Sequence, residues 1–213
     1  MQSWAVVVPA KRLAVAKTRL RPVTEGLGRA GHDELVLALL ADTVAAAISC
    51  PAVASVLVVT DDPAAAGVVR DLGALVVPDE PGRGLNPALE HGFAVAGAVA
   101  GAGAVAALSS DLPALRPAEL EAALRAAAGA PRCFVADAHG TGTTLLTALD
   151  SPLAPRFGVA SAAAHRSSGA HALEGTWPGL VQDVDTGADL DAAVALGTGR
   201  YTSAFMARLR AAR

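Results

Sequence analysis

Short apolar runs rich in β-branched residues alternate with alanine-rich stretches along the chain, and this alternation constrains the fold more than any other feature. The runs are continuous and apolar, as expected for strands that helices cover on both faces. Strands are predicted at residues 4–9, 53–60, 73–78, 104–110 and 132–137, with a further strand at 143–149. Helices are predicted between them, near residues 32–48, 63–71, 86–100 and 117–128.

This order of elements predicts a three-layer α/β fold of Rossmann-like character, with a mostly parallel sheet and right-handed crossovers. No linker divides the chain, so residues 1–213 are predicted to form a single domain. Residues 79–86 have the composition of a mobile loop, and residues 151–185 are expected to run irregularly around one short helix. Ligands of such sheets bind beyond the carboxyl ends of the strands, so functional residues are expected there.

The composition argues against several classes of function. The chain is 53% hydrophobic and 17% charged, which supports a large core and disfavours global disorder. Only 3% of residues are aromatic and the net charge is −3, so neither nucleic-acid binding nor membrane-surface binding is expected. No secretory signal or membrane-spanning segment is predicted. Cys50 and Cys133 are isolated in the sequence and are expected to be reduced thiols, which favours a cytoplasmic protein.

A cluster of positive charge follows the first predicted strand. It contains five of the 17 basic residues, namely Lys11, Arg12, Lys17, Arg19 and Arg21. A solvated surface cluster is the ordinary interpretation, but its place at a strand end favours phosphate binding, for which lysine and arginine are well suited. The segment lacks the glycine pattern of a Walker loop, which argues against a P-loop NTPase.

Carboxylates follow other predicted elements. Asp111 comes directly after the strand at 104–110, where a turn or a helix cap is the alternative to a functional role. Asp183 and Asp185 flank one valine, so in an extended segment both carboxylates point to the same side, as paired magnesium ligands would. Capping of a helix that starts near Gly187 would explain Asp185 but would leave Asp183 unexplained.

Two segments with small residues add further candidates. Residues 140–146 permit close approach of a ligand but lack the third glycine of a dinucleotide fingerprint. Ser161 precedes a predicted helix and follows Gly158; helix starts attract anions, although a serine that only caps its helix is the commoner case. The five histidines show no metal-binding spacing, and only His139 and His165 are candidates for a place near a ligand. Cations and carboxylates without an evident nucleophile favour phosphoryl or nucleotidyl transfer.

Six motifs occur in order between residues 4 and 197: PAKRLAVAKTRL, GLNPAL, SSDLPAL, FVADAHGTGTTLL, PRFGVASAAAHR and WPGLVQDVDTGADL. Together they resemble the CofC/FbiD family of guanylyltransferases, which contributes to the biosynthesis of coenzyme F-420. The resemblance implies a fold of the nucleotide-diphospho-sugar transferase type. It also implies an enzyme that joins GTP to phosphoenolpyruvate and releases pyrophosphate and enolpyruvyl-diphospho-5'-guanosine. Archaeal relatives are associated with 2-phospho-L-lactate instead, and the residues do not distinguish the two acids.

The resemblance further implies roles for individual residues. Three aspartates would hold Mg²⁺, namely Asp111, Asp183 and Asp185. Three residues on the acceptor side would contact phosphoenolpyruvate, namely Thr143, Gly158 and Ser161. Four residues would contact the nucleotide, namely Lys11, Lys17, Arg19 and Asn86. Lys17 and Asp111 would act in catalysis, and the next transferase of the deazaflavin pathway is a candidate protein partner alongside a homodimer.

Other interpretations stay open at this point. A cytidylyl- or molybdopterin-type nucleotidyltransferase would share the fold and differ in its substrates. A non-catalytic nucleotide-binding module would need the cations but would have little use for three aspartates. The family's wider superfamily begins with a glycine-rich phosphate loop, whereas PAKRLAVAKTRL has none, so its glycine contacts are not transferred to this chain.

Overall fold

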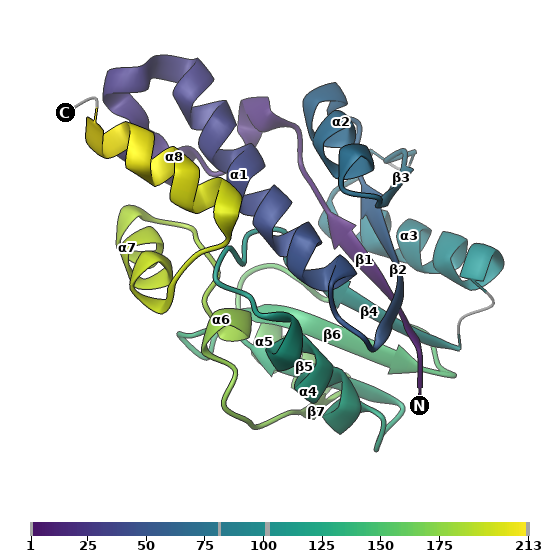
Figure 1. The fold of residues 1–213 in the computed structure, drawn as a ribbon. Helices are drawn as coiled ribbons and strands as arrows, with labels where there is room; N and C mark the ends of the chain where they lie inside the picture. Colours follow the sequence, from purple (N-terminus) through teal and green to yellow (C-terminus); the bar gives the residue numbers. More distant parts are fainter. Residues whose placement is uncertain (1, 81, 101–102, 212–213) are drawn as a thin grey trace.

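A computed structural model describes residues 2–80, 82–100 and 103–211 (Figure 1). Within these residues, seven strands form one sheet in the order β3-β2-β1-β4-β6-β5-β7. The strands are β1 (Trp4–Pro9), β2 (Val53–Val59), β3 (Leu75–Val77), β4 (Ala104–Leu108), β5 (Arg132–Ala136), β6 (Thr143–Leu149) and β7 (His171–Ala172). The six predicted strands are all present, and β7 is a short addition at the edge that the sequence did not predict.

The prediction of a mostly parallel sheet is confirmed. Parallel pairs join β1 to β2, β1 to β4, β2 to β3 and β5 to β7. Among the described strands only β6 runs the other way, because it is antiparallel to both β4 and β5. A tight hairpin joins β5 to β6, so the amino end of β6 lies at the same edge as the carboxyl ends of the parallel strands.

Helices cover both faces of the sheet, as predicted. They are η1 (Leu13–Val15), η2 (Thr18–Leu27), α1 (Gly28–Ile48), α2 (Pro63–Asp71), α3 (Leu85–Ala100), α4 (Pro117–Ala127), α5 (Ser161–Ser167), α6 (Pro178–Val181), α7 (Gly187–Leu196) and α8 (Arg200–Ala211). Successive residues of β1 enter opposite cores: Trp4 and Val6 pack with α1, α2 and α4, whereas Ala5 and Val7 pack with α3 and α5. The result is three layers with the sheet in the middle.

Local sequence explains where several helices begin. Asp62 caps α2 by accepting the backbone N–H groups of Ala64 and Ala65, and proline occupies the first turn of both α2 and α4. Thr186 caps α7 and forms a capping box with Asp189. None of the described helices is long and apolar enough to cross a membrane.

Three parts of the predicted organisation need comment. Residues 151–185 contain α5 as expected, but also β7 and α6, so the expectation of one short helix there was incomplete. Helix α8 was not predicted; it packs beside α1 (Figure 1), and Phe205 and Leu209 join a third apolar cluster with α1, η2 and α7. In the predicted loop at 79–86, residue 81 lies outside the described residues, and α3 already begins at Leu85.

Candidate active site

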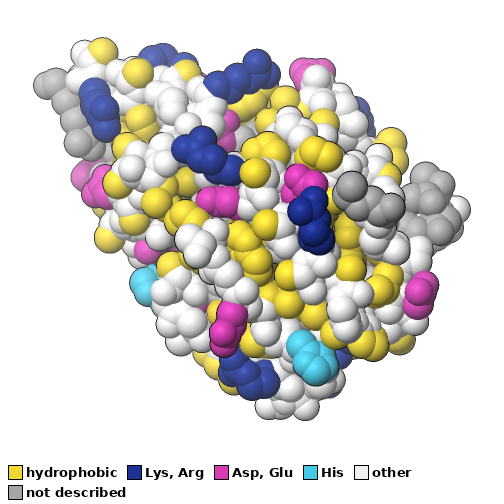
Figure 2. Space-filling model, turned by 60° about the horizontal axis from the view of Figure 1, so that its bottom comes forward, with side chains coloured by type: hydrophobic (Ala, Val, Ile, Leu, Met, Phe, Trp, Pro, Cys, Tyr) yellow, Lys and Arg dark blue, Asp and Glu magenta, His cyan; other side chains and the backbone are white. Residues whose placement is uncertain are grey.

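A cavity of about 860 Å³ lies at the sheet edge formed by the ends of β1 and β4 and the start of β6. Figure 2 shows basic and acidic side chains near one another on one face of the molecule, with hydrophobic side chains between them. Nine predicted site residues line the cavity, namely Lys11, Lys17, Arg19, Asp111, Thr143, Gly158, Ser161, Asp183 and Asp185. Residues that are up to 174 positions apart in the sequence are thus brought to one place, from Lys11 to Asp185.

Lys17 is the central cation of this site. Its backbone adopts a left-handed conformation with φ of 47°, at the junction between η1 and η2. The Nζ atom donates to Asp111 Oδ2 and to Asp185 Oδ1, so one ammonium group bridges two carboxylates. Burial alone would lower the pKa of Lys17, but the two carboxylates, Asp111 first, raise the pKa above its ordinary value. Lys17 therefore carries its positive charge throughout the physiological range.

Asp183 completes the group of carboxylates. It lies on the cavity wall with Asp185, while Val184 between them is fully buried, so the expectation that both carboxylates share one side is confirmed. The backbone N–H of Val184 donates to the carbonyl of Asp111 at 3.1 Å, which fixes the two segments against each other. Burial, and then the neighbouring Asp111 and Asp185, raise the pKa of Asp183 to about 7. Negative charge here thus exceeds what Lys17 neutralises.

A second wall of the cavity is built around Thr143, the first residue of β6. Thr143 Oγ1 accepts a hydrogen bond from Ser161 Oγ at 3.2 Å and lies 2.9 Å from His165 Nδ1. Ser161 is the first residue of α5, and Ala160 holds the capping position with φ of 55°. The interpretation of Ser161 as a helix cap is therefore wrong, because its hydroxyl faces Thr143. Gly158, with φ of 133°, precedes them in a conformation that side chains rarely adopt.

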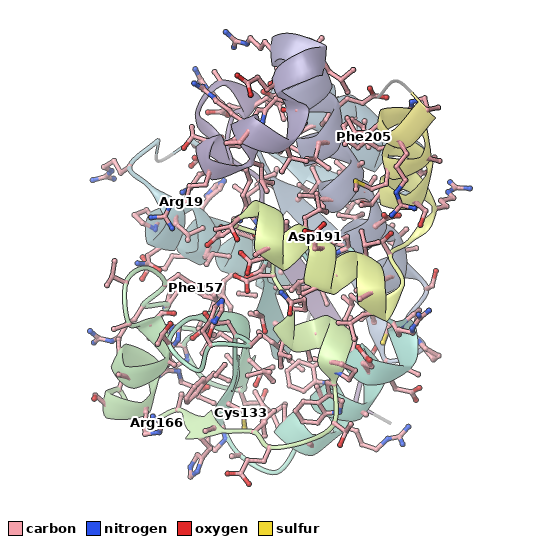
Figure 3. All side chains as sticks on the ribbon, turned by 90° about the vertical axis from the view of Figure 1, so that its left-hand side faces the viewer. Arg19, Cys133, Phe157, Arg166, Asp191 and Phe205 are labelled. Carbon is pink, nitrogen blue, oxygen red and sulfur yellow. The ribbon has the colours of Figure 1, made fainter. Side chains whose placement is uncertain are left out.

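Asn86 is the one predicted site residue that does not line the cavity. It lies in the first turn of α3, where Nδ2 donates to the carbonyl of Phe157 at 3.1 Å. The backbone N–H of Phe157 donates in return to Oδ1 at 2.8 Å. Phe157 itself lines the cavity, on the side of the molecule that also carries Arg19 (Figure 3). Contact between Asn86 and a nucleotide stays a prediction, and the structure gives this side chain a loop-holding contact.

The basic cluster after β1 divides into separate groups. Lys11 and Arg19 are exposed and line the cavity beside Lys17. Arg12 is 3.5 Å from Asp61, and Arg21 lines a neighbouring cavity between η2 and α1. Three of the five cations thus stand where phosphate groups could be bound.

Two residues of the cavity region, Asp137 and His165, are not among the site residues predicted from the sequence motifs. Asp137 lines the cavity and accepts the backbone N–H groups of Thr141 and Gly142, which shapes the β5–β6 hairpin. Asp137 is the last residue of the strand predicted at 132–137, and it directly follows β5 in the structure, much as Asp111 follows the strand predicted at 104–110. His165 was a weak candidate and is fully buried beside Thr143. His139, weighed with it, is instead a surface residue 3.6 Å from Asp189.

The carboxylates suit a divalent cation in their chemistry. Among residues 2–80, 82–100 and 103–211, no three His, Cys, Asp or Glu side chains are arranged as a ready-made metal site. Asp111, Asp183 and Asp185 nevertheless supply the hard oxygen donors that Mg²⁺ prefers. Burial, and then the charges of Asp111 and Asp185, raise the pKa of Asp183, and a further cation beside these carboxylates would offset their mutual repulsion. The donor set therefore fits a divalent ion.

The chain is similar to known proteins in both sequence and fold. The sequence model of the family described as "Guanylyl transferase CofC like" matches residues 4–212. The phosphoenolpyruvate guanylyltransferase of Geodermatophilus obscurus is 66% identical over 208 residues, which cover 97% of this chain and 95% of that protein. The fold resembles that of a Desulfovibrio desulfuricans protein assigned to the nucleotide-diphospho-sugar transferases, with a TM-score of 0.71 and 15% identity. That match covers 99% of this chain and 96% of the other.

A more distant likeness concerns a metal-bound structure. The manganese complex of Rv0371c from Mycobacterium tuberculosis matches with a TM-score of 0.53 and 20% identity, covering 92% of this chain and 99% of that chain. Identities this low establish the fold only, and they confirm the predicted nucleotide-diphospho-sugar transferase type. Together with the family match along almost the whole sequence, they identify the chain as a nucleotidyltransferase that belongs to the CofC-like guanylyl transferase family.

Proposed function

We propose that this protein joins GTP and phosphoenolpyruvate to give enolpyruvyl-diphospho-5'-guanosine and pyrophosphate, as a step in coenzyme F-420 biosynthesis. The observation that carries the proposal is the charge arrangement of the cavity. Lys17 bridges Asp111 and Asp185 on one wall, and the hydroxyl groups of Thr143 and Ser161 stand on another. Relatives with up to 66% identity that bear the name phosphoenolpyruvate guanylyltransferase support the choice of both substrates.

The chemical step is an in-line displacement at phosphorus. A phosphate oxygen of phosphoenolpyruvate attacks the α-phosphorus of GTP and forms the new P–O bond. The bond from the α-phosphorus to the oxygen that bridges it to the β-phosphorus breaks, and pyrophosphate leaves with that electron pair. The attacking oxygen is already anionic at neutral pH, so the reaction needs no general base. Positioning and charge neutralisation therefore carry the catalysis.

The cations of the cavity offset the repulsion between two polyanions. Lys17 is permanently charged and half-buried, so its field is weakly screened by solvent. Lys11 and Arg19 add exposed positive charge beside it and would contact the triphosphate. We assign Lys17 to catalysis because it is the cation that the fold holds in one place.

Mg²⁺ is the metal we propose for this site. Asp111, Asp183 and Asp185 would hold it through carboxylate oxygens. When bound, it would neutralise charge on the phosphates and on the departing pyrophosphate. The proposal is supported by the excess negative charge around Asp183 and by manganese in the structure of Rv0371c.

The acceptor acid is proposed to bind at Thr143, Gly158 and Ser161. Two hydroxyl groups and a glycine with an open backbone surround this part of the cavity. They suit the oxygens of a phosphorylated acid, to which the Thr143 hydroxyl can donate a hydrogen bond while Ser161 donates to Thr143. The same groups would also accept 2-phospho-L-lactate, which is the alternative substrate.

A substrate screen tests the function as a whole. Pyrophosphate release would be measured for ATP, CTP, GTP and UTP, each with phosphoenolpyruvate, 2-phospho-L-lactate or 3-phosphoglycerate in the presence of Mg²⁺. GTP with phosphoenolpyruvate is expected to give the highest kcat/KM. Higher turnover with 2-phospho-L-lactate would make that acid the substrate in place of phosphoenolpyruvate. Preference for another nucleoside triphosphate would make that nucleotide the substrate in place of GTP. Absence of pyrophosphate release with every pair would overturn the proposal.

Residues 1–213 are proposed to act as one nucleotidyltransferase domain, since the family match runs from residue 4 to 212. We also propose a cytoplasmic setting, in which the next transferase of the pathway receives the product. The buried free thiols of Cys50 and Cys133 agree with a reducing compartment.

A further inference from the structure

His165 is a buried titratable residue that the reaction scheme above does not use. It lies in α5 with its side chain fully buried, and its ring packs against Phe134 and Phe157 at centroid distances of 6.0 and 5.1 Å. Both ring nitrogens have polar partners. Nδ1 lies 2.9 Å from Thr143 Oγ1, and Nε2 accepts the backbone N–H of Arg156 at 2.9 Å.

These partners determine which nitrogen of His165 carries the proton. A backbone N–H can only donate, so Nε2 must be unprotonated, and the neutral ring then carries its hydrogen on Nδ1. Burial first, and then the positive charges of Arg132 and Arg156, lower the pKa of His165 to about 4. The ring is thus neutral at physiological pH, and Nδ1–H donates to Thr143 Oγ1.

The hydroxyl of Thr143 is oriented as a consequence. Its oxygen accepts hydrogen bonds from His165 Nδ1–H and from Ser161 Oγ. With both acceptor positions of the oxygen filled by protein donors, its own hydrogen is directed elsewhere. Thr143 and Ser161 line the cavity, so that hydrogen is available to a ligand there.

The same histidine also holds the adjacent loop. Arg156 and Phe157 have consecutive backbone N–H groups, one accepted by His165 in α5 and the other by Asn86 in α3. Gly158 follows immediately, so two side chains from different helices fix the segment that leads into it. One imidazole thereby connects a hydroxyl on β6 with the loop opposite.

We propose that His165 is a positioning residue, whose neutral Nδ1–H form presents the Thr143 hydroxyl as a hydrogen-bond donor to an anionic oxygen of the phosphorylated acid. This inference rests on the proposed function, in which Thr143, Gly158 and Ser161 bind that acid. The second contact of His165, in which Nε2 accepts a hydrogen bond from the backbone N–H of Arg156, holds the loop before Gly158 in a fixed position relative to Thr143.

Substitution by glutamine separates the two contacts of His165. In His165→Gln the terminal amide can still accept from Arg156, but the donor at the Nδ1 position is lost. KM for phosphoenolpyruvate is expected to rise about tenfold, while KM for GTP changes by less than about twofold. His165→Asn retains a donor near the Nδ1 position, so its KM for phosphoenolpyruvate is expected to stay close to that of the wild-type protein. His171→Gln is the matched control, because His171 is exposed on β7. A rise confined to KM for GTP would overturn the inference. So would an equal rise in KM for phosphoenolpyruvate in His165→Gln and His165→Asn.

A double-mutant cycle tests whether His165 acts through Thr143. Thr143→Val removes the hydroxyl, so adding His165→Gln to it should raise KM for phosphoenolpyruvate by less than about twofold further. Fully multiplicative effects would contradict the proposed connection. Thermal unfolding gives the folded fraction of each variant at the assay temperature. Comparing KM values at equal folded fraction separates this coupling from a general loss of structure.

The tautomer is measured on the unmodified protein, without substrate. Long-range ¹H–¹⁵N correlation spectra should show His165 with a protonated Nδ1 and a bare Nε2 between about pH 5 and 8. The opposite tautomer, or an imidazolium ring at neutral pH, would overturn the inference whatever the substrate. Failure of the wild-type protein to use phosphoenolpyruvate would instead overturn the proposed function, so the two failures are distinct.

Discussion

Asn86 and Phe157 exchange two hydrogen bonds, one in each direction, between a side-chain amide and a backbone peptide. The amide thereby mimics a neighbouring β-strand and fixes the conformation of Phe157 directly before Gly158. This contact places Asn86, in the first turn of α3, against the loop that contains Phe157 and Gly158.

Asn86→Ala is therefore expected to affect the acceptor more than the nucleotide. Loss of both hydrogen bonds should raise KM for phosphoenolpyruvate about tenfold, at about 1.4 kcal/mol. Pyrophosphate release, measured with each substrate varied in turn, checks this. Asn86→Asp keeps the acceptor for Phe157 and should show a smaller rise. A larger increase in KM for GTP than for phosphoenolpyruvate would instead establish the nucleotide contact that the sequence suggested.

Lys17→Ala should lower kcat about a hundredfold, because the variant loses the ammonium group that Asp111 and Asp185 hold in place and that would offset the charge of the phosphates. Lys17→Arg keeps the charge with a different shape and should retain part of the activity. Arg12→Ala is the control, since Arg12 is nearby, 69% exposed and paired with Asp61. Single-turnover rates at saturating GTP are the appropriate measurement. Equal rates for Lys17→Ala and Arg12→Ala would remove Lys17 from the catalytic group.

Asp183→Asn separates stability from activity. The substitution removes a half-buried negative charge beside Asp111 and Asp185, so in metal-free buffer the variant should gain about 1 kcal/mol in unfolding free energy. Turnover should fall at least about a hundredfold. Asp191→Asn, an exposed change on α7, should alter neither property.

Metal titration distinguishes the same two variants further. Mg²⁺ at about a hundred times its Kd should stabilise the wild-type protein by about 2.7 kcal/mol. The effect is expected to persist in Asp191→Asn and to shrink in Asp183→Asn, as followed by thermal unfolding with and without chelator. Identical Mg²⁺ stabilisation of both variants would exclude Asp183 as a ligand.

The lowered pKa of His165 predicts that the protein becomes less stable as the pH falls below 6.5. The pKa of His165 is lowered from 6.5 in the unfolded chain to about 4 in the fold, so protons favour the unfolded state between these values. This contribution is fully present above pH 6.5 and is lost as the pH falls towards 4, by up to about 3 kcal/mol. Arg132 and Arg156 are the positive charges that act on the ring, and Arg166 lies over the neighbouring ring of Phe134.

Denaturant unfolding at several pH values checks this effect. The difference in unfolding free energy between the wild-type protein and His165→Gln should narrow as the pH falls through that range. Curves that stay parallel from neutral to acidic pH would show that the imidazole does not stay neutral in the fold.

The layers of the fold could be predicted because their signals are local. Continuous apolar runs marked the strands, and proline after Asp62 and Arg116 marked the starts of α2 and α4. The reversed direction of β6 was missed, although residues 137–142 contain the glycines and aspartate of a tight hairpin. Helix α8 was missed because its apolar residues are sparse and find their partners only on packing.

The site could be predicted in its chemistry but not in its contacts. Asp111 was identified from its place after a predicted strand, and Asp185 from its spacing with Asp183. That one lysine bridges both carboxylates depends on packing between segments 94 and 168 positions away. The hydrogen bonds of His165 and Asn86 are likewise long-range and have no sequence signature. The tautomer of a buried histidine follows only from the hydrogen-bond partners of both ring nitrogens, which the structure supplies for His165.

The antiparallel course of β6 gives the two halves of the cavity separate structural origins. Lys17 and Asp111 follow the parallel strands β1 and β4, and Asp185 lies between α6 and α7, whereas Thr143 begins the returning strand of a hairpin. The halves meet along the β4–β6 ladder, where Ser109 donates to the carbonyl of Thr144 at 2.8 Å. If the acid binds as proposed, substitutions in the 156–161 loop would alter the groups around it while leaving the contacts of Lys17 with Asp111 and Asp185 in place. The wall around Thr143 and the wall around Lys17 therefore come from different segments of the fold.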